Sequence, residues 1–264
     1  MENHKPSTRF LRRHILASDR HPFIGRIIDL SIVSLYFDSY EELSKHPDCK
    51  YALEVDSALL GLTQRVESLN LVGKMLWPEP FPKHFKDFPI TRHDWLTVGA
   101  DAFLMRYVSI VDCAILLVNS VLECGLPLRS CTIQSLQKAG IPSRLIDVLR
   151  DLIADQGKLR GERNSRLHHG YERGFTLDDS TFRLAARLEK HGRGLRGTDM
   201  EDRPINVSRS FKEGLVELQR DFNFSTRKLV RRLDNLYDLL APEFERRFSP
   251  RFKPLPYEMR ERSS

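Results

Sequence analysis

Apolar residues recur every three or four positions along almost the whole chain. This spacing gathers them on one side of an α-helix. No run of alternating apolar and polar residues bounded by turn signals stands out, so no β-hairpin is predicted. The fold class predicted is therefore all-α.

The clearest apolar stripe lies in residues 94–123, where Gly125 follows as a stop signal. We expect this helix to be central and largely buried, because apolar neighbours widen the stripe. The stripe consists of Trp95, Val98, Ala102, Met105, Val108, Val111, Ile115, Val118 and Leu122.

The last predicted helix runs from about Val207 to Leu240, and Pro242 is expected to kink or end it. Its near-heptad spacing indicates a seam that packs against another helix, within the chain or across a dimer. The charged segment from Arg227 to Arg232 is interpreted as its solvated face. The seam positions are Phe211, Leu215, Leu218, Phe222, Ser225, Leu229, Leu233, Leu236 and Leu240.

A proline-rich segment, "WPEPFPKHFKDFP", cannot continue a helix and divides the chain. It predicts an N-terminal helical extension with its connector at 1–90, a helical bundle at 91–245 and a polar tail at 246–264. The connector's aromatic residues, Trp77, Phe81, Phe85 and Phe88, are expected to pack on a surface. Shorter helices are predicted at 25–44, 49–74, 132–139, 143–154, 158–169 and 178–190.

Composition narrows the class of protein. An apolar fraction of 41%, a charged fraction of 30% and a net charge of +6 are typical of a folded chain with a mild affinity for polyanions. The longest apolar run, Ala114 to Val118, is far below the roughly 20 residues that span a bilayer, so no membrane association is expected. The basic N-terminus is interpreted as a loose tail, with a mitochondrial-type targeting segment as the alternative.

The four cysteines show no C-x-x-C pair and no partnering histidine pair, so neither a metal site nor a cofactor is expected. Unpaired thiols fit a reducing, cytoplasmic setting. The segment "GRGLRG", Gly192 to Gly197, matches G-x-G-x-x-G, but a predicted helix precedes it where a dinucleotide site needs a strand. It is interpreted as a charged loop.

The segment "RNSRLHHG", Arg163 to Gly170, concentrates groups that bind phosphate or move a proton. Histidine exchanges protons near neutral pH, and arginine binds phosphate and stabilises developing negative charge. Together they suit attack on a phosphodiester by the 2′-hydroxyl of RNA. The alternative is structural, because basic residues at a helix C-terminus also complement the helix dipole.

The order R-N-x-x-x-H, Arg163 to His168, resembles the R-x₄₋₆-H signature of the HEPN superfamily (higher eukaryotes and prokaryotes nucleotide-binding), and "HHG" is similar to its frequent H-x-G ending. The resemblance covers about Asp94 to Leu240. An upstream Glu and a Lys-Arg pair found in some members have no clear copy here, which leaves the branch unassigned.

The resemblance implies an HEPN-like helical bundle, a metal-independent endoribonuclease and an active site built between two protomers. Carried over, Arg163 and His168 are the catalytic pair, and Asn164 is the accompanying polar residue. Other members of the superfamily are non-catalytic modules that bind RNA, nucleotide or a protein partner. Binding without catalysis is therefore the rival hypothesis, and a helical scaffold is the third hypothesis.

Helix geometry adds a constraint on these roles. Arg163 and His168 lie about 140° apart around a helix, whereas Asn164 and His168 differ by only about 40°. The helix therefore frays near His168, or a second protomer in a homodimer supplies the missing group. We assign substrate binding to His169, Arg166 and Ser165.

Two polar residues on the apolar helix, Asp112 and Asn119, are candidates to support the motif. A buried polar network is the plain alternative for both. The predicted partners are RNA, a second copy of the chain and a regulatory protein such as an antitoxin. The predicted setting is a defence or toxin–antitoxin system.

Overall fold

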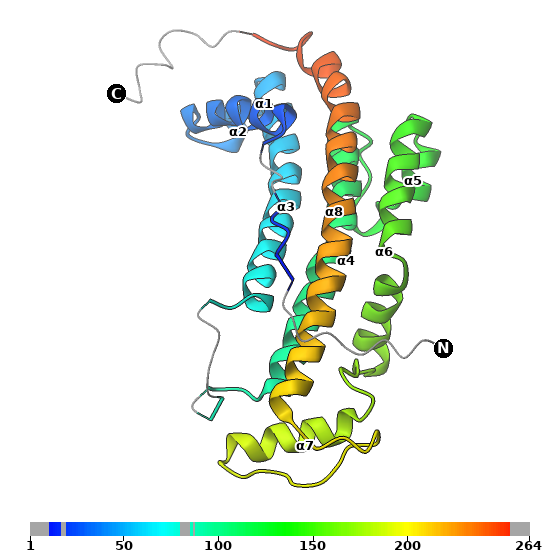
Figure 1. Cartoon of the computed structure of the whole chain (residues 1–264). Coiled ribbons are helices and arrows are strands. Elements are labelled where there is room, and N and C mark those ends of the chain that lie inside the picture. The colour runs from blue at the N-terminus through cyan, green and yellow to red at the C-terminus, as the bar shows by residue number, and fades with distance from the viewer. Residues whose placement is uncertain (1–10, 17–19, 80–84, 87, 254–264) are drawn as a thin grey trace. The chain divides into compact units, whose positions relative to one another are not determined.

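The computed structural model describes residues 11–16, 20–79, 85–86 and 88–253 (Figure 1). Over these residues every regular element is a helix, apart from an isolated bridge between Thr198 and Pro204. The prediction of an all-α chain is confirmed. None of the helices in these ranges has the length and apolar content to cross a bilayer.

The α-helices are α1 (Pro22–Ser31), α2 (Tyr40–Leu43), α3 (Pro47–Leu76), α4 (Arg92–Val121), α5 (Ile133–Lys138), α6 (Ser143–His169), α7 (Asp179–Lys190) and α8 (Val207–Phe248). Two 3₁₀ turns, η1 (Ile32–Tyr36) and η2 (Leu128–Ser130), complete the elements. They belong to two compact units. Of the described residues, the first unit takes those in 1–15, 68–108 and 157–227, and the second those in 16–67, 109–156 and 228–253. Both units draw on the predicted N-terminal extension.

The first unit has an aromatic core. The rings of Phe103 and Phe222 lie 5.8 Å apart between centroids, and those of Phe85 and Phe211 lie 5.3 Å apart. Phe85 belongs to the proline-rich connector and is 2% exposed, which confirms the packing predicted for that residue. Phe81 lies outside the described residues.

The second unit is closed around Tyr51. Its ring stacks on Phe244 at 5.2 Å, and its hydroxyl donates a hydrogen bond of 2.7 Å to the carbonyl of Val121. Burial raises the pKa of Tyr51 well above its ordinary value. The hydroxyl therefore stays protonated and continues to satisfy the last carbonyl of α4.

Local sequence sets where several helices begin. Thr91 and Asp94 exchange side-chain-to-backbone hydrogen bonds of 3.2 and 3.1 Å at the start of α4. Thr132 accepts from the backbone of Ser135 before α5, and Asp178 accepts from Thr181 before α7. Each of these side chains satisfies a backbone N–H that has no partner within its helix.

The predicted burial of the apolar stripe on α4 is confirmed in the later part of the helix and is wrong at two earlier positions. Its later positions, such as Val111 and Val118, are fully buried. Val98 and Met105, however, are 49% and 43% exposed, because the core of the first unit lies on the face that carries Phe103. Two apolar faces overlap in this part of the helix, and period alone does not say which one is covered.

Helix α8 confirms its predicted seam, since every seam position is buried. The predicted end near Leu240 is wrong, because the helix includes Pro242 and continues to Phe248. Proline removes one backbone hydrogen bond, while the buried ring of Phe244 holds the following turns. A single helix at 25–44 is also wrong: α1, η1 and α2 replace it, and Ser39 caps α2 by accepting from the backbone of Glu42 at 3.1 Å.

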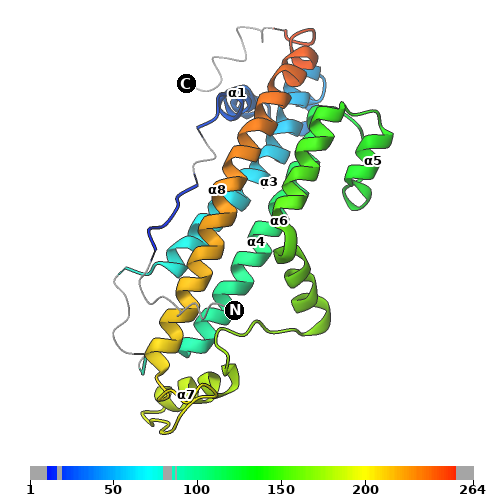
Figure 2. The same cartoon turned by 45° about the vertical axis from the view of Figure 1, so that its right-hand side comes forward.

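Residues 11–15, which we call the N-terminal strap, form no helix and belong to the first unit (Figure 2). Side-chain amides of α8 bind their backbone. The Leu11 N–H donates to Gln219 Oε1 at 3.0 Å, and the His14 N–H donates to Asn223 Oδ1 at 2.8 Å. Asn223 Nδ2 donates in turn to the carbonyl of Arg12 at 2.9 Å. The expected loose tail is therefore wrong for residues 11–14.

Candidate functional site

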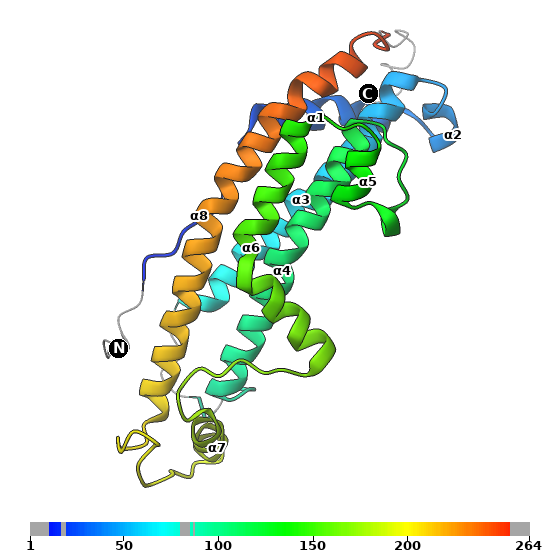
Figure 3. The same ribbon diagram turned by 90° about the vertical axis from the view of Figure 1, so that its right-hand side faces the viewer.

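The motif-bearing segment is the last part of α6, from Lys158 to His169. It follows a break in the helix at Gly157, where φ is 43° and ψ is −126° (Figure 3). Gly170, with φ of 63°, ends it. Glycine takes positive φ without the steric cost that a β-carbon brings. The predicted separation of helices 143–154 and 158–169 is therefore confirmed as a break within one element.

Arg163 and Asn164 form a pair at the centre of this segment. Arg163 Nη1 donates a hydrogen bond of 2.8 Å to Asn164 Oδ1. The arginine is half-buried, whereas the asparagine is exposed. The amide oxygen thus orients one edge of the guanidinium.

His168 and His169 are both exposed at the end of α6. Their ring centroids lie 6.4 Å apart with the planes inclined at 66°. An exposed imidazole can exchange protons with a substrate that approaches from solvent. Because the helix remains regular through His169, Arg163 and His168 stay about 140° apart around it.

Arg166 is occupied by carboxylates. Its side chain is 7% exposed, and its Nε lies 2.6 Å from Asp101 Oδ1 on α4. Its Nη1 lies 3.6 Å from Glu162 Oε1 on the preceding turn. A substrate phosphate would have to displace Asp101 to reach this guanidinium, so these contacts make Arg166 a residue that anchors the helix end.

Sequence reasoning missed Arg173, which follows the motif. It donates to Asp221 Oδ2 at 2.6 Å and to Glu217 Oε1 at 2.9 Å, both on α8. Burial alone would lower the pKa of Arg173, but the bond to Asp221 and the charges of its carboxylate neighbours raise it above its ordinary value. No local pattern predicts these contacts, because the partners lie in different helices.

Together these side chains form an ion-pair network, made of Asp101, Glu162, Arg166, Arg173, Glu217 and Asp221. Its two arginines face four carboxylates. The balance is negative, so the network repels an additional anion. It links the motif segment to α4 and α8 within the first unit.

An open hollow of about 390 Å³ adjoins the network. Ser165 lies at its edge, so the structure brings this predicted substrate residue to a concave surface. Tyr171, which is 55% exposed, also lines it. The other lining residues are Lys158, Glu162, Arg173 and Gly174.

The two residues predicted to support the motif belong to the second unit. Asn119 closes the end of α4: its Nδ2 donates to the carbonyl of Leu126 at 3.2 Å, and its Oδ1 accepts from the Leu126 N–H at 3.1 Å. Asp112 is exposed on α4. The contacts of Asn119 are those of a helix cap.

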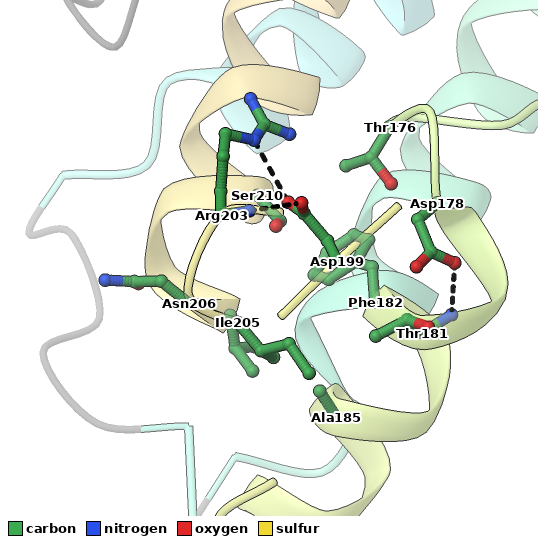
Figure 4. A pocket seen from close by; sticks show the side chains of 11 residues that line it. Thr176, Asp178, Thr181, Phe182, Ala185, Asp199, Arg203, Ile205, Asn206 and Ser210 are labelled. Atoms are coloured by element: carbon green, nitrogen blue, oxygen red, sulfur yellow. Dashed lines mark hydrogen bonds and ion pairs between the residues drawn. The ribbon is translucent and has the colours of Figure 1, made fainter. Parts of the chain in front are cut away.

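The loop after "GRGLRG" builds a polar turn in the first unit (Figure 4). Asp199 accepts from the backbone N–H groups of Glu201 and Arg203 at 2.9 and 3.0 Å. The adjoining cavity, about 10 Å³, has room for one water molecule. Helix α7 precedes the glycines, which excludes the strand that a dinucleotide fingerprint requires. In the described ranges no group of three or more His, Cys, Asp or Glu side chains is placed to hold a metal ion.

Comparisons with known proteins give no relative. No family model matches the chain, and neither does any curated protein or solved structure.

Proposed function

We propose that the protein is an HEPN-type endoribonuclease that cleaves RNA through its own side chains, without a metal ion. The observation that carries the proposal is the end of α6. There an exposed His168 stands one turn beyond the Arg163–Asn164 pair, whose hydrogen bond measures 2.8 Å. An accessible proton carrier and an oriented guanidinium are the two groups that phosphodiester cleavage needs, and the same helix end supplies both.

The reaction begins when neutral His168 takes the proton from the 2′-hydroxyl of RNA. The 2′-oxygen then bonds to the adjacent phosphorus, and Arg163 stabilises the extra negative charge of the phosphorane. The bond from phosphorus to the 5′-oxygen breaks, and a protonated imidazole of the site returns a proton to that oxygen. The products are a 2′,3′-cyclic phosphate and a 5′-hydroxyl end.

The angular separation of Arg163 and His168 favours a site built from two copies of the chain. Since they lie about 140° apart on a regular helix, one copy directs them at different points. In a two-fold dimer, His168 of one copy faces Arg163 of the other. His169 and Ser165 then lie beside the substrate, and Arg166 supports the helix from beneath.

We further propose that this activity serves a cytoplasmic defence or toxin–antitoxin system, in which a regulatory protein restrains the enzyme. A nuclease whose site needs only its own side chains and a second copy is active once it dimerises. Its cell therefore has to control it. Blocking the two exposed imidazoles, His168 and His169, is the simplest way for such a partner to act.

A second function, a non-catalytic module that binds RNA or protein, is favoured by one observation. The ion-pair network has four carboxylates against two arginines, and Arg166 is 7% exposed within it. A motif arginine used this way stabilises a helix end without taking part in chemistry. In this reading Arg163 has the same supporting role through Asn164.

The test is cleavage of a fluorescent single-stranded RNA by the purified protein in EDTA. His168→Ala and Arg163→Ala should each lower the rate by about 10²-fold or more, the usual contribution of a general acid–base or charge-stabilising group. His191→Ala and Arg193→Ala, at exposed positions after α7, are the matched controls and should cleave like wild type.

Two further measurements separate the alternatives. A substrate with 2′-deoxyribose at the cleaved position should resist, because the nucleophile is missing. Cleavage that requires Mg²⁺, or that persists in both motif variants, would refute the mechanism. A dimer that binds RNA but never cleaves it would establish the module.

A further inference from the structure

Four arginines of the first unit stand apart from the ion pairs that occupy Arg166 and Arg173. They are Arg12 and Arg13 of the N-terminal strap and Arg220 and Arg227 of α8. Among the residues that the structure describes, none of the four forms an ion pair with a carboxylate. Arg12, Arg220 and Arg227 are exposed, and Arg13 is half-buried.

The α8 members share one face of the helix. At 100° per residue, Arg220, Phe224 and Arg227 fall within an arc of about 60°. Phe224 is 64% exposed between the two cations. An exposed aromatic ring flanked by arginines one turn away on either side is a cationic and apolar surface at once.

The strap adds to this face because Asn223 holds it there. Asn223 lies about 40° from Arg227 around α8, and its Nδ2 donates to the carbonyl of Arg12 at 2.9 Å. His14 lies near Arg227 as well: burial, and then the positive charge of Arg227, lower the pKa of His14. The anchoring thus holds the backbone of Arg12, an exposed arginine, on the same stretch of α8 that carries Arg220 and Arg227.

We propose that this basic–aromatic surface (Arg12, Arg220, Phe224 and Arg227) binds single-stranded RNA. The inference rests on the proposed function for its choice of ribonucleic acid. The arginines suit successive phosphates of a strand, and the exposed ring of Phe224 suits an unpaired base, which stacks on aromatic side chains. A duplex offers no free base face to that ring, so single strands are preferred.

The position of the surface relates it to the motif. Beyond Phe224 around α8 come Glu217 and Asp221, about 20° and 60° further on, and both are held by Arg173. Arg173 in turn follows the motif helix and meets its Glu162 at 3.9 Å. The surface therefore borders the network that supports the motif. Because that network repels phosphate, a strand bound across α8 should follow the arginines and leave Glu217 and Asp221 uncovered.

The experiment measures binding of a labelled single-stranded 2′-O-methyl RNA of about 20 nucleotides, in which the 2′-oxygen cannot attack. Arg220→Gln/Arg227→Gln should raise Kd about tenfold and reduce the slope of log K against log salt by about 1.4, or 0.7 for each lost phosphate contact. Phe224→Ser should raise Kd about five-fold or more with little change in slope, since it removes stacking.

Arg144→Gln and Leu128→Ser are the controls, both at exposed positions of the second unit, and should bind like wild type. Circular dichroism confirms that each variant is folded. The same RNA in a duplex should bind more weakly than the single strand and respond little to Phe224→Ser.

This experiment tests the RNA-binding surface and the nuclease activity independently of each other. Loss of binding in the surface variants supports the inference even when wild type never cleaves RNA, the outcome that would refute the nuclease. Wild type that does not bind the RNA, or surface variants that bind it unchanged, would overturn the inference whatever His168 does. Variants that instead lose binding only to anionic vesicles or to an acidic peptide would also overturn it.

Discussion

Arg166 Nε lies 2.6 Å from Asp101 Oδ1, and this ion pair joins the motif-bearing end of α6 to α4. The arginine side chain is 7% exposed, while the aspartate is 50% exposed. The pair therefore holds the outer edge of a buried guanidinium. The sequence predicts that Arg166 binds the substrate. In the structure a carboxylate, that of Asp101, contacts its guanidinium.

Asp101→Asn should lower the free energy of unfolding by about 1–3 kcal/mol, because it leaves a buried guanidinium with less opposing charge. Urea unfolding measures the change. The control is Asp147→Asn, which breaks an exposed pair with Arg150 at 3.5 Å and should change stability by less than about 1 kcal/mol. Equal effects for the two variants would contradict the role of Arg166 as an anchor.

Gly214→Ala should destabilise the first unit by about 1–3 kcal/mol, the usual effect of overpacking a core. A β-carbon there would lie 2.6 Å from Leu96 Cδ1 and 2.9 Å from Phe175 Cβ. Gly161→Ala is the opposite case, since nothing lies within 4 Å of its β-carbon. On helix α6 it should stabilise by about 0.5–1 kcal/mol. Thermal unfolding that shows the reverse order would refute this description of the packing.

Asp179 predicts a dependence of stability on pH. Burial alone would raise the pKa of Asp179, but hydrogen bonds from His93 Nε2 at 2.9 Å and the Phe175 N–H at 2.8 Å bring it below the ordinary value of 3.8. A depressed pKa in the folded state stabilises the fold above the ordinary value, and that contribution is lost as the pH falls through the folded pKa.

Asp179→Asn should therefore be less stable than wild type near neutral pH, and the difference should shrink as the pH falls below about 4. Urea unfolding at a series of pH values from neutral to acid checks this. A difference that stays constant over the whole range would show that shape, and not the charge of the carboxylate, is what Asp179 contributes.

Asn223→Ala should release the N-terminal strap, because it removes the partners of the Arg12 carbonyl and the His14 N–H. Trypsin should then cleave after Arg12 and Arg13 several-fold faster than in wild type, since proteolysis follows local opening. Asn235→Ala, at an exposed position later on α8, is the control. Cleavage at the wild-type rate would mean that Gln219 and Trp77, which both bind the backbone of Leu11, hold the strap without Asn223.

Local chemistry accounts for what could be predicted from the sequence. The helix predicted at 158–169 ends at His169, before Gly170, and the helix predicted from residue 132 begins at Ile133 after its cap Thr132. Both boundaries depend on neighbouring residues only. The seam of α8 was predictable because its apolar residues keep one spacing throughout. Val98 shows where this kind of prediction fails. Its spacing places it in the same apolar stripe as buried residues, yet it is 49% exposed.

The candidate site was only partly predictable for the same reason. The sequence presents Arg163, Arg166 and His168 as equivalent members of one cluster. Their environments differ, because Arg166 is paired with Asp101 and Glu162, Arg163 is hydrogen-bonded to Asn164, and His168 is exposed. Which cation receives a carboxylate depends on contacts between helices, and no spacing within α6 encodes them.

Gly157 is a position at which single-base mutations are expected to disturb the structure. Its φ of 43° suits a residue without a β-carbon, and almost every change in the first or second base of a glycine codon supplies a residue that has one. Such a mutation would leave every motif residue in place and still alter the path of the helix that carries them. Loss of function by this route would be invisible to a search that inspects only the motif.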